Sequence, residues 1–128
     1  MLQKEIDGGI PTKNIVIGGF SQGGALALYT GLQQSSTYAG ILVKSGYLPD
    51  VGNVTVTEAA KDTPIHFFHG IDDPMVKHQW GFETAEKVRE LGCKNVQFRD
   101  YEGLEHGANE EELHDVAAWL QQVIPPGL

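Results

Sequence analysis

The stretch Ile15–Tyr29, which reads IVIGGFSQGGALALY, decides the fold of this chain. It opens with a β-branched run that predicts a short buried strand, and it continues into apolar residues at helical spacing that predict a helix. Between them lies Gly19-Phe20-Ser21-Gln22-Gly23, a G-x-S-x-G pattern at the point where a strand would turn into a helix. Such a turn is tight and strained, and it presents the serine oxygen at the mouth of a sheet. We therefore expect Ser21 to be a nucleophile, with small residues required two positions before and after it.

Three further apolar runs predict strands, and helical patterns lie between them. Strands are expected at 15–17, 41–43, 65–68 and 96–101, helices at 25–32, 76–91 and 110–124, and a loop over 50–62. Strand–helix alternation predicts an α/β fold of about four mostly parallel strands with crossover helices. In such sheets the active groups lie in loops at the carboxyl ends of the strands.

Signals at the helix ends refine this prediction. Gly92 is expected to end the second helix, and Asn109 is expected to cap the last one, with acidic residues facing its positive N-terminal end. The expected core stripe of the last helix is Leu113, Val116, Ala117, Leu120 and Ile124, and Pro125-Pro126 would end the helix.

Composition and charge exclude several classes of protein. The 128 residues include 9 Lys and Arg and 17 Asp and Glu. The resulting net charge of −8 argues against a protein that binds nucleic acid or an anionic membrane. No G-K-[ST] follows the glycine-rich turn, which excludes a phosphate loop of the Walker type. Cys93 is the only cysteine, so an intramolecular disulfide and a cage of several thiolates are excluded. Because Met1–Asp7 lacks the layout of a signal peptide and no apolar run could span a bilayer, a cytoplasmic location is expected.

A nucleophilic serine needs a base, and the base needs an acid that orients it. On strand–turn–helix scaffolds of this kind the chain order is serine, acid, histidine. Asp72-Asp73-Pro74 follows the third expected strand, and His106 follows the fourth. Pro74 biases Asp73 toward an extended backbone that could aim its side chain away from the strand, whereas Asp72 could cap the turn. These arguments leave both acids open.

The chain has five histidines, and His106 has the position expected of the base. His69 ends a strand near the expected site and is either a second candidate or a hydrogen-bonded packing residue. His66 and His114 are expected to be structural or solvated, and His78 is expected on an exposed helix surface. No H-E-x-x-H motif occurs, so no metal site is expected.

Several motifs are shared, in order, with a known family. They are Gly9-Ile10-Pro11, the run Gly18–Tyr29, Ser45-Gly46-Tyr47-Leu48-Pro49, Thr63-Pro64-Ile65 with His69-Gly70, Asp72-Asp73-Pro74-Met75-Val76, and Tyr101–His106. Through them nearly the whole chain resembles the acyl-protein thioesterase and carboxylesterase family of α/β-hydrolases. The resemblance implies Ser21 as nucleophile, Asp73 as orienting acid and His106 as base, with no cofactor.

The resemblance also implies residues that contact the substrate. The backbone N–H of Gln22 would be one oxyanion donor. Met75 matches a position that helps to line the acyl channel, and Tyr47 and Leu48 belong to a motif near the site. The chain departs from the family at Tyr47, where Trp is usual, at Lys77, where Pro is frequent, and just before His106, where small residues are commoner. These departures concern the shape of the pocket more than the triad.

The family carries several strands before the elbow strand. Residues 1–128 are therefore expected to form a single α/β-hydrolase domain that corresponds to the C-terminal part of the family's fold. This part lacks the loop that supplies a second oxyanion donor in the family. The strand Ile15–Ile17 would then be an unpaired edge, through which we expect the chain to associate with itself. The alternative is that Met1–Asp7 folds over this edge and shields it.

Two functions of different classes follow. The first is a serine hydrolase that cleaves acyl esters or thioesters, with an acylated protein, a lysophospholipid or a small ester as substrate. The second is a catalytically weak fragment that acts as a binding or assembly module. The complete set of candidate triad residues favours the first, and the expected loss of the N-terminal part favours the second.

Overall fold

The architecture follows from a computed structural model, which describes residues 10–124. The predictions that fall on Met1–Asp7 and on Pro125-Pro126 lie outside the described residues. The elements in chain order are η1 (Thr12–Asn14), β1 (Val16–Phe20), α2 (Gln22–Gly31), β2 (Gly40–Lys44), η2 (Val51–Asn53), η3 (Ala60–Asp62), β3 (Ile65–Gly70), α3 (His78–Glu90), β4 (Val96–Tyr101) and α4 (Glu110–Val123).

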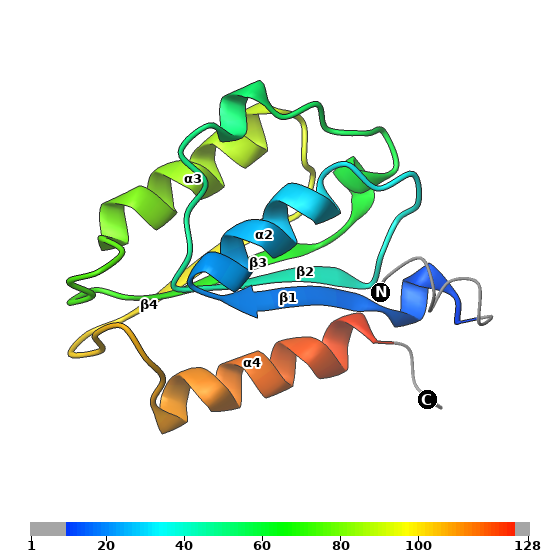
Figure 1. Cartoon of the computed structure of the whole chain (residues 1–128). Helices are drawn as coiled ribbons and strands as arrows, with labels where there is room; N and C mark the ends of the chain where they lie inside the picture. The colour runs from blue at the N-terminus through cyan, green and yellow to red at the C-terminus, as the bar shows by residue number, and fades with distance from the viewer. Residues whose placement is uncertain (1–9, 125–128) are drawn as a thin grey trace.

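The four strands form one parallel sheet in the order β1-β2-β3-β4. Helices α2 and α3 cover one face of the sheet, and α4 covers the other (Figure 1). The register aligns Phe20 with Lys44, Lys44 with Phe68 and Gly70 with Tyr101, so all four strands end along the same border. The predicted α/β fold is confirmed, and β1 forms one edge of the sheet.

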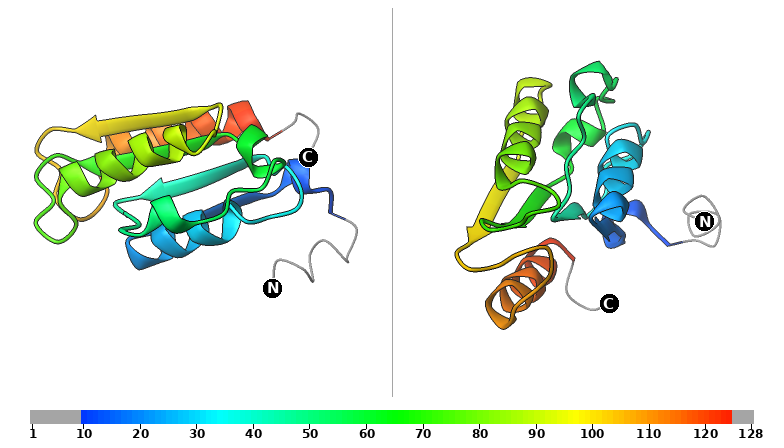
Figure 2. Two further views of the ribbon diagram at one scale, coloured as in Figure 1. Left: turned by 90° about the horizontal axis from the view of Figure 1, so that it is seen from above. Right: turned by 60° about the vertical axis from the view of Figure 1, so that its left-hand side comes forward.

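Each face of the sheet packs its own apolar cluster. The larger cluster lies beneath α2 and α3 and includes Leu28, Ile41 and Phe67, which are almost fully buried. The smaller cluster includes Phe68 and Trp119 and joins the sheet to α4. The views in Figure 2 show α4 alone beneath the sheet, with α2 and α3 side by side above it. The strands bury apolar residues on both faces because helices cover both, as parallel sheets require.

The core stripe of α4 differs from the prediction. Leu113 is 52% exposed and Ala117 is exposed, while Glu112, Val116 and Trp119 are buried. The stripe is rotated by one residue because Glu112 is buried as the partner of Lys44, whose Nζ lies 3.2 Å from Glu112 Oε1. A pattern based on apolar residues alone misses a buried carboxylate, since burial of a charge requires a partner elsewhere in the fold.

The other helices agree more closely with expectation. Asn109 caps α4 by accepting a hydrogen bond from the Glu112 amide at 2.8 Å. Gly92 follows α3 with φ at 105°, a conformation that favours glycine. On α2, however, Leu26 and Tyr29 are exposed and the buried positions include Ala27 and Leu28. The helical spacing predicted the helix correctly but not which of its apolar residues face the sheet.

Candidate active site

The turn from β1 into α2 holds Ser21 in a strained backbone conformation. Ser21 has φ 58° and ψ −119°, values that side-chain-bearing residues rarely adopt, and α2 begins at the next residue. Its amide donates to the Lys44 carbonyl at 2.8 Å, which ties the turn to the end of β2. The serine side chain therefore projects from the border where the four strands end.

The glycines around Ser21 have unequal roles. A Cβ atom on Gly19 would collide with the backbone carbonyl of Gly23, so the position two residues before the serine must be glycine. A Cβ atom on Gly23 would meet nothing within 4 Å among the described residues, whereas one on Gly24 would lie 3.0 Å from the Gly19 carbonyl oxygen. The expectation that the residue two positions after the serine, Gly23, must be small is therefore wrong. The close approach to the strand is made by the next residue, Gly24.

The turn after β3 distinguishes the two candidate acids. Asp73 is 5% exposed, and its Oδ1 accepts hydrogen bonds from the amides of Met75 and Val76, both at 2.9 Å. Its Oδ2 lies 2.7 Å from Nδ1 of His106. Asp72 is exposed and instead accepts from the Gly103 amide at 3.0 Å. The structure thus brings Asp73, and not Asp72, to His106.

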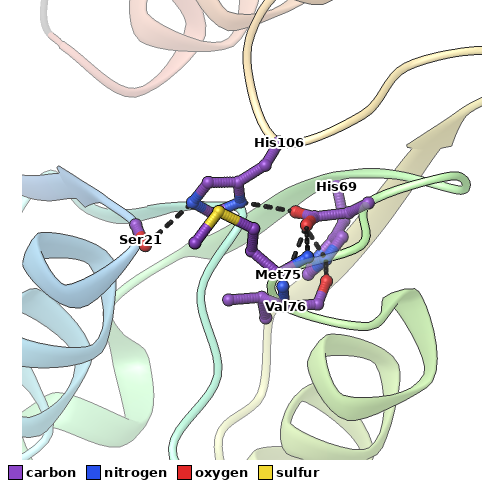
Figure 3. Close-up of polar contacts among 6 residues, drawn as sticks. Ser21, His69, Met75, Val76 and His106 are labelled. Carbon is purple, nitrogen blue, oxygen red and sulfur yellow. Dashed lines mark hydrogen bonds and ion pairs between the residues drawn. The ribbon is translucent and has the colours of Figure 1, made fainter.

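His106 lies between Asp73 and Ser21. Its Nε2 is 3.0 Å from Ser21 Oγ, so one imidazole links the carboxylate to the hydroxyl (Figure 3). The ring also packs against Phe20, with the ring centroids 4.8 Å apart. With the carboxylate as acceptor for Nδ1–H, the Nε2 lone pair is directed at the serine hydroxyl, which is the tautomer that a general base requires.

The environment of Asp73 favours its charged form. Burial by itself would raise the pKa of this carboxyl, but hydrogen bonds from His106 and from the Val76 and Met75 amides outweigh burial and lower it. The charged form of Asp73 would stabilise an imidazolium at His106 whenever that ring accepts a proton.

Gln22 provides the backbone donor expected beside the serine. It is the first residue of α2, and the first N–H groups of a helix point along the axis without an intrahelical acceptor. The positive end of the helix dipole therefore lies next to Ser21, where it would stabilise a developing negative charge.

The residues expected to bind substrate lie in two places. Met75 is 69% exposed, and its amide donates to Oδ1 of Asp73, so it lies on the turn that holds the acid of the site. Tyr47 and Leu48 line a cavity of about 340 Å³, which also includes Trp80. The rings of Tyr47 and Trp80 are 5.0 Å apart. Neither Trp80 nor Phe20 was expected near the site from the sequence. Phe20 could have been, because it occupies the variable position directly before the serine.

The remaining histidines lie away from Ser21. His66 stacks on Phe68 on the face of the sheet that α4 covers, with the ring centroids 4.0 Å apart. Nε2 of His78 lies 2.9 Å from a carboxylate oxygen of Asp100. His114 is exposed on α4. His69 is buried at the end of β3, where Nε2 lies 2.7 Å from the Val76 carbonyl. Across residues 10–124, no three His, Cys, Asp or Glu side chains are grouped as a metal site would need.

Comparison with known proteins identifies the family. The sequence model described as Phospholipase/Carboxylesterase matches residues 1–124. The chain belongs to the phospholipase/carboxylesterase family. Among curated proteins, acyl-protein thioesterase 1 of Neurospora crassa is 43% identical over 98% of the chain, and acyl-protein thioesterase 1 homolog 2 of Dictyostelium discoideum is 37% identical over 98%.

Solved structures match the fold as well. The crystal structure of Arabidopsis thaliana SOBER1 has a TM-score of 0.89 and 34% identity over 97% of the chain, and that of Zea mays acyl-protein thioesterase 2 has a TM-score of 0.76 and 25% identity over 84%. The chain spans 52% of the Neurospora crassa protein and 57% of the Dictyostelium discoideum protein, or about half of each. None of the helices within residues 10–124 is long and apolar enough to cross a membrane.

Proposed function

We propose that this protein is a serine hydrolase that cleaves acyl esters or thioesters, with residues 1–128 as the C-terminal part of a single α/β-hydrolase domain. The observation that carries the proposal is the continuous hydrogen-bonded line from Asp73 Oδ2 through His106 to Ser21 Oγ, with distances of 2.7 Å and 3.0 Å. Membership of the phospholipase/carboxylesterase family supports ester or thioester chemistry. The only cysteine is buried, which suits a cytoplasmic location.

The first half of the reaction forms an acyl-enzyme. Ser21 Oγ attacks the acyl carbonyl carbon while its proton passes to Nε2 of His106. The carbonyl oxygen becomes an oxyanion, which the Gln22 N–H and the positive end of α2 stabilise. The tetrahedral intermediate then collapses, the bond to the leaving oxygen or sulfur breaks, and the proton on Nε2 moves to the leaving group. The alcohol or thiol departs, and the acyl group stays on Ser21.

The second half repeats these steps with water. A water molecule loses a proton to Nε2 of His106 as its oxygen attacks the acyl carbon. Collapse of the second tetrahedral intermediate breaks the bond to Ser21 Oγ, which regains a proton from His106. The carboxylic acid is released, and the charged Asp73 holds the imidazole in place and stabilises its imidazolium form in both halves.

The exposed side chains near Ser21 suit an acyl substrate. Met75 offers an exposed, flexible apolar surface on the turn that holds Asp73, and its unbranched thioether adapts to chains of different shape. We propose that an acyl chain passes Met75 and that Tyr47 and Leu48 contact the substrate on the α3 side. A lysophospholipid, an acylated protein and a small ester all present the carbonyl that this chemistry requires.

A fluorophosphonate probe tests the proposal on the 128-residue chain. The probe phosphonylates an activated serine, so we expect one label per chain on Ser21, with none in Ser21→Ala. Ser35→Ala removes an exposed serine after α2 and should label normally. Hydrolysis of a short p-nitrophenyl ester and of an acyl thioester should follow the same pattern. A folded chain without label and without hydrolysis would contradict the proposal and favour the binding module.

A further inference from the structure

A second histidine lies directly behind the candidate triad. His69 is the penultimate residue of β3 and is only 1% exposed. Its Nε2 lies 2.7 Å from the carbonyl oxygen of Val76 and 3.5 Å from Oδ2 of Asp73, the same oxygen that His106 contacts. The Oδ2 atom of Asp73 therefore has two imidazole nitrogens as neighbours, Nδ1 of His106 and Nε2 of His69.

The contacts of His69 determine where its proton lies. Both neighbours of Nε2, the Val76 carbonyl and the Asp73 carboxylate, are acceptors only, so Nε2 must carry a hydrogen. Burial lowers the pKa of His69, which favours the neutral ring. The ring is thus a fixed N–H donor whose dipole points at the carboxylate turn, without a second positive charge that would compete with an imidazolium at His106.

The other side of the ring is held by α3. A Cβ atom on Gly81 would lie 2.5 Å from Nδ1 of His69, so the helix backbone approaches the ring more closely than any side chain would allow. The imidazole is therefore clamped between the first turn of α3 and the turn that holds Asp73. A residue whose only purpose was to fill space would not need a polar ring at this position.

Val76 connects the two histidines. Its N–H donates to Oδ1 of Asp73 at 2.9 Å, and its C=O accepts from Nε2 of His69 at 2.7 Å. The peptide groups around Val76 are thus fixed from both directions, and the carboxylate is fixed with them. Displacement of the Val76 carbonyl would move the amide that sets the angle of the carboxylate toward His106.

We propose that His69 is a positioning residue that holds the Asp73 carboxylate, through Val76, at the distance and angle that place His106 against Ser21. This inference rests on the proposed function for its consequence in catalysis, but it also predicts a state of His106 that can be measured without turnover.

Two substitutions separate the hydrogen bond from the volume of the ring. In His69→Gln the side-chain amide can place a donor near the position of Nε2 and retain the bond to Val76, whereas in His69→Asn the shorter amide cannot reach it. His66→Asn is the matched control, because His66 lies in the same strand on the opposite face and its Nδ1 has no hydrogen-bond partner within the described structure. Gly81→Ala is a further variant, which pushes the ring without removing its donor.

The kinetic readout is the rate of fluorophosphonate labelling together with kcat and KM for a short ester. We expect His69→Asn and Gly81→Ala to lower the labelling rate and kcat by about 10- to 100-fold with little change in KM, since a small misplacement of a catalytic group has costs of this order. His69→Gln should recover to within about threefold, and His66→Asn should label at the normal rate. Equal rates in folded His69→Gln, His69→Asn and unsubstituted chains would overturn the proposal.

The spectroscopic readout is independent of activity. Ring nitrogen shifts in NMR spectra of the unsubstituted chain should show His69 protonated at Nε2 and His106 protonated at Nδ1. In His69→Asn and Gly81→Ala we expect His106 to show a mixture of tautomers, and in His69→Gln the single tautomer should return. If the unsubstituted chain fails to hydrolyse esters, the proposed function fails while this test still decides the role of His69. Protonation of His69 at Nδ1, or an unchanged His106 tautomer in folded variants, would overturn the inference.

Discussion

The two outer strands of the sheet, β1 and β4, are built from opposite kinds of residues. β4 alternates half-buried apolar residues with exposed polar ones, and two of its charged side chains are paired: Arg99 with Asp115 at 3.1 Å and Asp100 with His78 at 2.9 Å. β1 reads VIGGF and has no charged side chain. Charges on an edge strand discourage pairing with another strand, so β4 carries this protection, whereas within residues 10–124 the strand β1 has no charge of its own that would provide it.

The two residues that would exchange a proton, Ser21 and His106, follow these same two strands in the chain. Three strand spacings of about 4.8 Å separate β1 from β4, a width of roughly 14 Å, yet His106 Nε2 lies 3.0 Å from Ser21 Oγ. Ser21 is positioned by the geometry of β1 itself, because the turn follows the strand directly. His106 must return across the end of the sheet on the loop after β4, so its position depends on Asp73 and Phe20.

The largest effect on activity is expected from a change at Asp73, which holds His106 by a hydrogen bond. Asp73→Asn should lower kcat by about 10⁴-fold with the fold intact, because the amide removes the negative charge and favours the wrong tautomer of His106. Asp72→Asn is the matched control, because the Asp72 carboxylate accepts from the Gly103 amide and not from His106, so this variant should lose far less activity. Ester hydrolysis and thermal unfolding of both variants measure the two effects. The opposite ranking would assign the orienting role to Asp72.

The next effect concerns the turn that β1 builds. Gly19→Ala should destabilise the chain by about 3 kcal/mol and abolish labelling of Ser21, since its Cβ meets the Gly23 backbone, which cannot move like a side chain. Gly23→Ala has open space and should fold and label normally. Urea unfolding with fluorophosphonate labelling compares the pair. Normal labelling of Gly19→Ala would show that Ser21 is not fixed by β1 in the way described.

A smaller effect on stability is expected at acidic pH, through His66 in β3. Burial, together with the charge of Arg99, lowers the pKa of His66 to about 4 from an ordinary value of 6.5. Because the folded chain binds this proton less readily than the unfolded chain, the stability that the neutral ring provides is present above pH 6.5 and is lost as the pH falls toward 4. The loss is about 3 kcal/mol at most.

His66→Phe provides the control for this pH dependence. The phenyl ring can keep the packing against Phe68 and Trp119 but has no titrating group. Urea unfolding between pH 7 and pH 4 should therefore show a shallower decline in the variant. The comparison separates His66 from Glu112, whose pKa is raised by burial and whose contribution has the opposite sign. Parallel declines in both chains would show that His66 stays uncharged or unfolds locally.

The smallest expected effect is association through β1. We expect the purified chain to self-associate weakly, because β1 pairs only with β2 among the described residues and carries no charge to oppose a second strand. Sedimentation over a concentration series should show a rising average mass, and amide exchange in β1 should slow at high concentration while that in β4 stays constant. A monomer at every concentration would show that the β1 edge is adequately protected.

Much of this arrangement could be predicted because it depends on local signals. The apolar runs and helical spacings determined the four strands, and the G-x-S-x-G pattern located Ser21 at the end of β1. The parallel order then implied that Ser21, the acid and His106 follow strands that end on one border. Asp72 and Asp73 could not be separated in this way, because the choice depends on which side chain reaches a loop that is distant in sequence.

The features that escaped prediction involve partners distant along the chain. Glu112 is buried because Lys44, at the end of another strand, lies beside it, and this pair rotates the inner face of α4 away from Leu113. His69 gains its contacts from Val76 and from the close approach of Gly81, and neither can be read from the pattern of β3. Hydrophobic periodicity reports which positions can be buried, but not which polar groups will find a partner there.

The strained backbone of Ser21 implies a trade-off between durability and chemistry. With φ at 58° and ψ at −119°, this residue occupies a conformation that only glycine adopts without cost, and the penalty for other residues is about 1–3 kcal/mol. Selection for folding alone would therefore favour glycine at position 21, although glycine would remove the hydroxyl. The presence of serine at this position therefore costs the chain stability at the residue that the proposed function makes the nucleophile. Although alanine usually gives a more stable chain than glycine, we expect Ser21→Gly to be more stable than Ser21→Ala.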